Sequence, residues 1–259
     1  MFAHITGPLT GLPDREPDSG VMKIAAALVV LASCLCARTA LAAEDLITSA
    51  RYPNGDPAPY ILDSAGPSPK YVLILFPGGD GQVNPRLRDG KLAHAYAGNF
   101  LLRSRRFFVD ADFVTVTTDA SSSEARIQAV LDDIARRFPG AKVYLAGTSN
   151  GTNPTMALAA YLQDRIAGEI HTSSRAPIYW FDARQYRNRH LVVHHVNDWC
   201  RVTPYSAALR SHEAYGNEFI AMEGGVSTGD ECGAFAHHGF NGIERETVDA
   251  IKAWIRKGG

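Results

Sequence analysis

The 259-residue sequence predicts an α/β fold, with a mostly parallel central sheet and helices on both of its faces. Uninterrupted apolar runs of strand length, such as 71–76 and 143–146, indicate strands that are buried on both sides. Apolar residues recur at helical spacing between these runs, so strands and helices alternate along the chain, as they do in parallel sheets. With 46% hydrophobic residues and no internal repeat, the chain can form one large domain with a substantial core.

The predicted elements begin after a proline-rich stretch. Prolines limit regular structure in residues 44–70, so this part is expected to be loop-rich, with only short edge strands. The predicted strands are 71–76, 113–117, 143–146, 169–174, 190–196 and 218–222. The predicted helices are 92–106, 127–138, an alanine-rich segment after residue 151, 204–215 and 243–256. Aromatic residues gather in the expected loop 175–188, where 179–181 either line a binding pocket or pack against the core.

The N-terminus has the pattern of an export signal. A short basic region at Met22-Lys23 precedes the apolar residues 24–35, and Ala40-Leu41-Ala42 has the A-x-A form of a cleavage site. We therefore expect residues 1–42, an extension plus signal peptide with translation starting at Met22, to be removed, leaving 43–259 as an exported α/β domain. The apolar run is too short to anchor the chain by spanning a bilayer. An alternative is a lipoprotein signal, which would place a lipid on Cys34.

Charge and cysteine content restrict the partners and the compartment. The net charge is -1 and there is no basic cluster, which argues against nucleic acid as a partner. Of the four cysteines, Cys34 and Cys36 lie in the segment expected to be removed. The remaining pair, Cys200 and Cys232, is expected to form a disulfide, because paired cysteines of exported proteins are usually oxidised.

The segment 147–151, Gly-Thr-Ser-Asn-Gly, lies between a predicted buried strand and a helix. A serine flanked by glycines in this setting is the nucleophile-elbow pattern, in which a strained turn lifts the hydroxyl above the sheet. Glycine is needed on either side because larger side chains would collide with the neighbouring strand and helix. The N–H of Asn150 would face the charge that develops on an attacked carbonyl. Pro154 suggests that the helix begins only there, with Asn153 as its cap.

Three other strand ends carry suitable partners for Ser149. The first central strand ends in Pro-Gly-Gly-Asp-Gly, where the N–H of Gly79 could be a second oxyanion donor. Asp198 follows the strand 190–196, and His238 follows the last strand. In parallel sheets, sites lie where strands reach their carboxyl ends, so these residues are expected to meet.

Each of these assignments has a competitor within the sequence. His237 adjoins His238, and only one of the two can face the serine. Asp119 and Asp182 compete with Asp198, because they could also follow strands. His194 and His195 are interpreted as strand residues with satisfied ring nitrogens. A metal site built from these histidines is disfavoured, since adjacent strand residues point to opposite faces and no H-E-x-x-H motif is present.

From Tyr71 onward, the glycine loop, the elbow, the segment HHVNDWC and the tail CGAFAHHGFNGIE together resemble an α/β-hydrolase. The resemblance is to small exported bacterial serine hydrolases without a large cap domain. It implies Ser149 as nucleophile, His238 as base and Asp198 as the orienting acid, with Gly79 and Asn150 in the oxyanion hole. It also implies carboxylester hydrolysis through an acyl-enzyme, acting on a small-molecule substrate and needing no cofactor or metal. A catalytically silent binding protein and a serine peptidase or amidase on the same fold remain alternatives.

Overall fold

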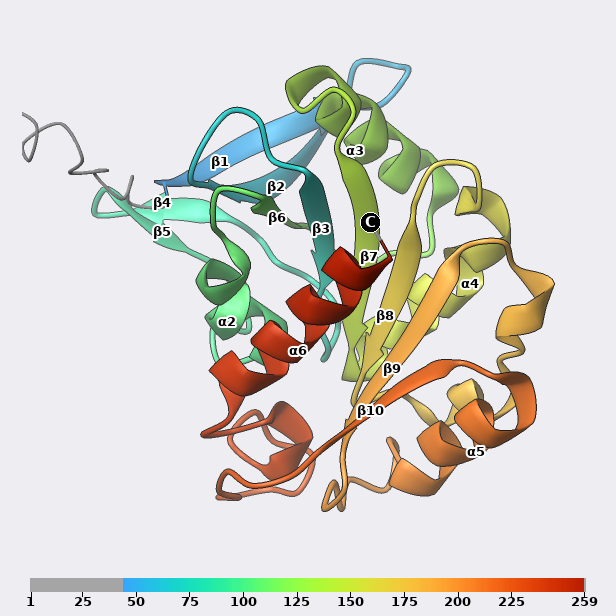
Figure 1. Cartoon of the computed structure of the whole chain (residues 1–259). Coiled ribbons are helices and arrows are strands. Elements are labelled where there is room, and N and C mark those ends of the chain that lie inside the picture. The colour runs from blue at the N-terminus through green and yellow to red at the C-terminus, as the bar shows by residue number, and fades with distance from the viewer. Residues whose placement is uncertain (1–43, 259) are drawn as a thin grey trace, which may run out of the picture. The chain divides into compact units, whose positions relative to one another are not determined.

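An eight-stranded sheet is the centre of the computed structural model, which describes residues 44–258, all within one compact unit (Figure 1). Its strands are β1 Glu44–Arg51, β2 Pro57–Ser64, β3 Tyr71–Phe76, β6 Phe113–Thr117, β7 Lys142–Thr148, β8 Gly168–Thr172, β9 Arg189–His195 and β10 Glu218–Met222. They are arranged in the order β1-β2-β6-β3-β7-β8-β9-β10. All neighbours from β6 to β10 pair in parallel, whereas β1–β2 and β2–β6 are antiparallel. The predicted mostly parallel α/β sheet is therefore confirmed.

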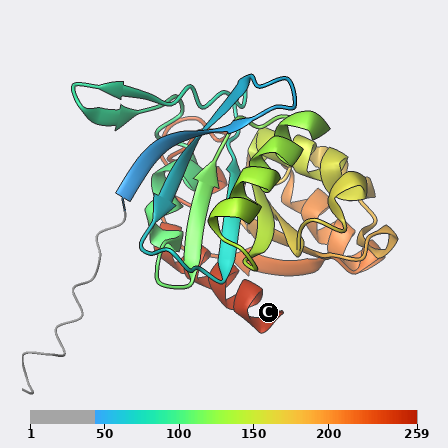
Figure 2. The ribbon, with the colours of Figure 1, turned by 90° about the horizontal axis from the view of Figure 1, so that it is seen from above.

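Helices cover both faces of this sheet (Figure 2). The helices α2 Phe100–Phe108 and α6 Glu244–Lys257 pack on one face, over a core that includes Phe100, Trp254 and the strand residue Leu73. The helices α3 Glu124–Arg137, α4 Thr152–Leu162 and α5 Tyr205–Tyr215 lie on the other face. Every residue of β3 is buried, as its unbroken apolar sequence predicts, and every residue of β6 is buried too, although β6 contains two threonines.

The segment 44–70 is more regular than its prolines suggested. It forms a hairpin of two eight-residue strands, β1 and β2, at one edge of the sheet. Pro57 and Pro59 lie in the part of β2 that pairs only with β1, because β6 pairs with β2 at Ile61–Asp63. A proline near an edge removes no hydrogen bond from the central ladder, which explains why these strands persist.

The predicted helix 92–106 is wrong over its first half. Residues Lys91–Ala93 form strand β5, which pairs with β4, Arg86–Arg88, in a separate two-stranded sheet. The helix α2 begins only after Asn99, whose side chain accepts a hydrogen bond from the N–H of Leu101. Asparagine favours this capping position because its side chain satisfies an N–H that the first helical turn leaves free.

The expected extension and signal peptide, residues 1–42, and the lipid site at Cys34 lie outside the described residues. None of the helices between residues 44 and 258 combines the length and the apolar character needed to cross a bilayer.

Candidate active site

Ser149 sits on a strained turn at the carboxyl end of β7. Its φ is +52°, a left-handed conformation that is uncommon outside glycine, and residues Ser149–Gly151 form a single 3-10 turn. A Cβ on Gly147 would lie 2.8 Å from the carbonyl carbon of Gly151, and a Cβ on Gly151 would lie 2.5 Å from the carbonyl oxygen of Pro77. Backbone atoms therefore occupy the space on both sides of the serine, as the glycine spacing predicts.

Replacing Gly151 with alanine is expected to destabilise the fold by about 3 kcal/mol or more, because the new methyl group meets carbonyl oxygens that cannot move independently. The midpoint of urea unfolding would measure the change. Gly66→Ala is the matched control, because nothing lies within 4 Å of a Cβ at Gly66. Equal midpoints for the two variants would contradict the steric account.

The helix after the turn begins earlier than Pro154 suggested. Gly151, not Asn153, is the residue before α4, which starts at Thr152 and contains Pro154 in its first turn. Proline is tolerated there because N–H groups of the first turn have no partner within the helix. The hydroxyl of Thr152 donates to the carbonyl of Ser149 at 2.7 Å, which fixes the turn to the helix.

The glycine loop after β3 lies against the same turn. Gly79 has φ +68°, and the side-chain amide of Asn150 donates to its carbonyl at 2.7 Å. Neither the N–H of Gly79 nor that of Asn150 is a donor in the turn and loop hydrogen bonds of the described chain. A Cβ on Gly78 would lie 3.0 Å from the Cβ of Ser149, so the loop approaches the serine closely.

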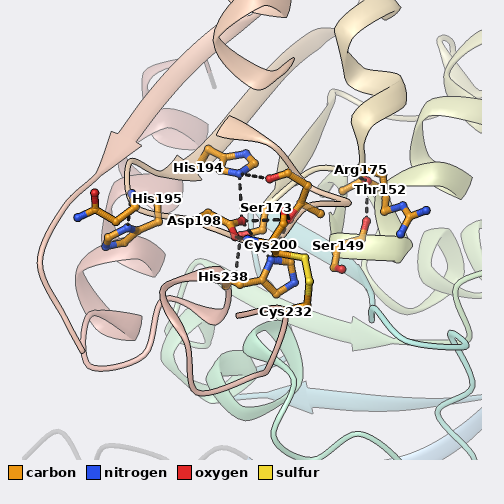
Figure 3. A network of polar contacts seen from close by, with 12 residues as sticks. Ser149, Thr152, Ser173, Arg175, His194, His195, Asp198, Cys200, Cys232 and His238 are labelled. Atoms are coloured by element: carbon orange, nitrogen blue, oxygen red, sulfur yellow. Dashed lines mark hydrogen bonds and ion pairs between the residues drawn. A yellow bond between two sulfur atoms is a disulfide. The ribbon is translucent and has the colours of Figure 1, made fainter. Parts of the chain in front are cut away.

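Asp198 and His238 lie side by side, although they are 40 residues apart in the sequence (Figure 3). Nδ1 of His238 lies 3.1 Å from Oδ2 of Asp198, and both residues are buried. Figure 3 also shows His194 on the opposite side of Asp198, with its Nε2 3.1 Å from the same oxygen. The hydroxyl of Thr203 and the N–H of Cys200 donate to the carboxylate at 3.2 and 3.0 Å. Asp198 is thus held by four groups.

These contacts determine the charge of the acid and the tautomer of the base. Burial by itself would raise the pKa of Asp198, but the hydrogen bonds from His194 and His238 outweigh burial and hold that pKa well below its usual range. An ionised carboxylate can only accept, so the proton of a neutral His238 resides on Nδ1. Its Nε2 is then unprotonated and can accept a proton from a nucleophile.

The competing residues are engaged elsewhere. Asp182 pairs with Arg184 at 2.7 Å, and Asp119 pairs with Arg126 at 3.1 Å. Nδ1 of His195 accepts from the N–H of Asn197, and its Nε2 lies 2.8 Å from the carbonyl of Gly224.

Of the two adjacent histidines at the last loop, His237 stacks on His195 with ring centres 4.3 Å apart, and only His238 contacts Asp198. His194 lies on β9, as interpreted, and its Nε2 contacts both Asp198 and the carbonyl of Thr203. Its Nδ1, however, is buried without a partner among residues 44–258, so only one of its ring nitrogens is satisfied.

Two contacts from other elements hold the loop that carries His238. Ser173, at the end of β8, donates its hydroxyl to the carbonyl of His238 at 2.6 Å. The guanidinium of Arg103, on α2, donates to the carbonyl of Gly239 at 2.6 Å and also pairs with Glu244. The loop that carries the imidazole is therefore held both by the chain that follows β8 and by α2.

The predicted disulfide between Cys200 and Cys232 is present. Cys200 lies two residues after Asp198, and Cys232 lies six residues before His238. The bond therefore joins the loop after β9 directly to the loop that carries the histidine, which limits how far the two can separate.

Reducing this disulfide is expected to lower the melting temperature by roughly 10 °C, because it closes a loop of about 30 residues and such a bond contributes on the order of 3 to 4 kcal/mol. Calorimetry with and without a phosphine reductant would measure this. The Cys200→Ser, Cys232→Ser double variant should have the melting temperature of the reduced wild-type protein, and the reductant should not change it. Equal melting temperatures for the reduced and oxidised proteins would contradict this contribution to stability.

The serine, the histidine and the glycine loop all border one pocket of about 200 Å³. Ser149, His238 and Gly79 all line it, although no hydrogen bond joins the Ser149 hydroxyl to His238 within residues 44–258. Catalytic hydrogen bonds often tighten only when substrate is bound. Asn150 does not line this pocket through its side chain, which is turned to the glycine loop.

No sequence motif identifies several of the residues that line the pocket. Tyr96, Asn99, Phe100 and Ala234 line it, and Tyr96 has φ +54° at the segment wrongly predicted as helix. Only Asn99 could have been found, from its capping position before an apolar run. The aromatic residues 179–181 are not among the lining residues.

No protein-family model matches the chain, and no curated protein sequence matches it. Solved structures do. A serine hydrolase without a lid from Xanthomonas campestris is 15% identical, with a TM-score of 0.52 over 80% of this chain and 95% of its own. Est1E from Butyrivibrio proteoclasticus is 15% identical, with a TM-score of 0.56 over 82% and 99%. The carboxylesterase EstE1, cloned from a metagenomic library, is 16% identical, with a TM-score of 0.53 over 93% and 98%. The chain has the α/β-hydrolase fold.

Proposed function

We propose that this protein is a serine hydrolase that cleaves carboxylic esters through an acyl-enzyme intermediate. The observation that carries the proposal is the pocket that Ser149 and His238 share, with His238 bonded to Asp198. The order Ser149, Asp198, His238 along the chain is the order that this fold uses for nucleophile, acid and base.

In the proposed reaction, the Ser149 hydroxyl attacks the ester carbonyl while Nε2 of His238 takes its proton. The negative charge on the carbonyl oxygen is stabilised by the N–H groups of Gly79 and Asn150. Asp198, kept ionised, stabilises the imidazolium that forms. The imidazolium then protonates the departing alkoxide, and a water activated by His238 releases the acid from Ser149.

Esters are the preferred class because an alkoxide leaves with less assistance than an amine. A pocket of about 200 Å³ is small beside typical ligand pockets, which begin at about 300 Å³, so we expect short acyl groups to be preferred.

We further propose that residues 1–42 are removed during export, so that 43–259 acts in the periplasm or outside the cell. The disulfide between Cys200 and Cys232 supports an oxidising compartment. Mass spectrometry of the mature protein would test this, and an N-terminus at residue 1 would contradict it.

A fluorophosphonate probe tests the central proposal, because it reacts with activated serines. We expect one adduct, on Ser149, and none on the Ser149→Ala variant. Chromogenic esters of increasing acyl length, measured beside aminoacyl amides, then identify the substrate class. Folded wild-type protein without an adduct would favour a silent binding protein, and faster cleavage of the amides would favour a peptidase.

A further inference from the structure

A second group of chemically reactive side chains lies buried on β8 and β9, apart from the pocket of Ser149. Glu169 and His171 are two residues apart on β8, and His190 is the residue on β9 that pairs with Glu169. Alternate residues of a strand share a face, so all three side chains project from the same side of the sheet. Glu169 and His171 are 0% exposed and His190 is 3% exposed.

The polar atoms of this cluster face one another without hydrogen bonds. Nδ1 of His190 is 3.6 Å and Nε2 of His171 is 3.8 Å from Oε2 of Glu169, and both separations are too long for hydrogen bonds. Five buried polar atoms of the cluster have no hydrogen-bond partner among residues 44–258: both carboxylate oxygens of Glu169, Nε2 of His171 and both ring nitrogens of His190. Unpaired buried polar groups are rare because each one costs free energy, so five of them in one place call for a ligand.

The tautomer of His171 follows from its neighbour on α4. The hydroxyl of Thr155 donates to the carbonyl of Thr152 at 2.9 Å, so its oxygen accepts from Nδ1 of His171 at 3.0 Å. The proton of His171 is therefore on Nδ1, and the lone pair of Nε2 points toward Glu169. A metal-binding histidine is commonly fixed in this way, with one nitrogen donating to an oxygen and the other left for the metal.

Burial keeps both imidazoles neutral. It lowers the pKa of His171 to about 3, with a further contribution from His190, and lowers the pKa of His190 to about 4. Burial also raises the pKa of Glu169 well above its usual value. A neutral imidazole keeps one unprotonated nitrogen, and this is the form of histidine that binds a metal.

We propose that Glu169, His171 and His190 bind one Zn²⁺ ion. One ligand atom from each residue lies within 4.8 Å of the other two. Ligand atoms around tetrahedral zinc are about 3.3 to 3.5 Å apart, so the separations of 3.6 and 3.8 Å need only small side-chain rotations. Two imidazoles and one carboxylate are a donor set that zinc prefers, and the fourth position is left for water.

The cluster lies next to an open pocket and is packed against aromatic rings, and the side chains of Glu169, His171 and His190 are themselves fully buried. His190 lines an open pocket of about 200 Å³ together with Asn188, whose side-chain amide is also buried and unpartnered. The rings of Phe181 and Tyr186 pack against His190 with centres 5.1 and 5.2 Å away. This pocket shares no residue with the one lined by Ser149.

The test uses the untagged mature protein after treatment with a chelator, and it needs no enzymatic activity. Titration calorimetry with Zn²⁺ should give one ion per chain, and Co²⁺ should give the visible absorption of a tetrahedral complex. At a free zinc concentration of 100 times the dissociation constant, the melting temperature should rise by roughly 5 to 10 °C.

Three variants distinguish this site from other zinc-binding groups. Glu169→Gln and His190→Gln should each weaken zinc binding by at least about 100-fold, since even outer-shell changes cost 10- to 100-fold. His212→Gln, which changes an exposed histidine on α5, should bind zinc as the wild type does.

Without metal, Glu169→Gln should melt within a few degrees of the wild type, because glutamine has the shape of glutamate and its amide can donate to the facing ring nitrogens of His171 and His190. If this variant folds normally, its loss of zinc binding cannot be explained by unfolding. The proposal would be overturned if zinc neither bound at one ion per chain nor raised the melting temperature. It would also be overturned if Glu169→Gln bound zinc as tightly as the wild type. The cluster would then be a protonated carboxyl among neutral imidazoles.

Discussion

Replacing either Ser149 or His238 with alanine is expected to lower kcat for ester hydrolysis roughly 10⁵- to 10⁶-fold, and replacing both should lower it no further. The two side chains act as one unit, because the hydroxyl is a poor nucleophile without a base and the imidazole has no proton to accept without the hydroxyl. The residual rate would come from binding and from the N–H groups of Gly79 and Asn150.

Steady-state rates with a short-chain chromogenic ester would measure these losses. His237→Ala is the matched control, because His237 stacks on His195 and does not contact Asp198. We expect it to keep activity within about tenfold of the wild type. A large loss in His237→Ala with a small one in His238→Ala would reverse the assignment of the base. Additive losses in the double variant would show that the two residues do not work together.

Replacing Asp198 with asparagine is expected to lower kcat about 10⁴-fold. An amide can donate a hydrogen bond to Nδ1 of His238, which would stabilise the tautomer whose Nε2 is already protonated and cannot accept the serine proton. Nδ1 of His238 and Nε2 of His194 both lie 3.1 Å from Oδ2 of Asp198, so the substitution disturbs two imidazoles. His194 contacts Asp198 and does not contact His238, so any effect it has on His238 passes through Asp198.

The control substitutions are Asp119→Asn and Asp182→Asn, which change carboxylates paired with arginines away from the pocket. Both should leave kcat within a few-fold. Equal losses of kcat in Asp182→Asn and Asp198→Asn would contradict the proposal that Asp198 is the acid of the triad.

The loss of stability caused by Asp198→Asn is expected to depend on pH. The pKa of Asp198 is lower in the folded protein than in the unfolded chain, so its ionised form stabilises the fold at pH values above the unfolded value of about 3.9. This contribution is lost as the pH falls toward the folded pKa. The difference in unfolding free energy between the wild type and Asp198→Asn should therefore shrink below about pH 4, and a difference that grows there would contradict it.

The sequence predicted those parts of the molecule that depend on neighbouring residues. The uninterrupted apolar run of β3 could only be a strand buried on both faces, and it is. Steric crowding on either side of Ser149 was predicted from its flanking glycines. A Cβ at Gly147 would meet the backbone of Gly151, and a Cβ at Gly151 would meet the carbonyl oxygens that end strand β3. The cysteine pair could be assigned because only two cysteines remain beyond the expected signal peptide.

The sequence misled where a contact in the folded chain outweighs the pattern of residue types. Tyr96 fits a helical stripe, yet its ring lies against Gly79 in the pocket, and the helix begins only after Asn99. Prolines in β2 signalled a loop, but the strand persists because its partner at that point is the edge strand β1. His194 looked like an ordinary strand residue because nothing nearby in the sequence shows that the chain turns back to place Asp198 beside it.

By itself, the sequence determined the alternation of strands and helices, the strained turn at Ser149 and the order of the three candidate residues. These follow from side-chain size, polarity and backbone sterics, which act over a few residues. Only the tertiary structure decided that His238 and not His237 contacts Asp198, and that Glu169 faces His190. Such contacts depend on the register of neighbouring strands and on loop closure, which the whole fold sets.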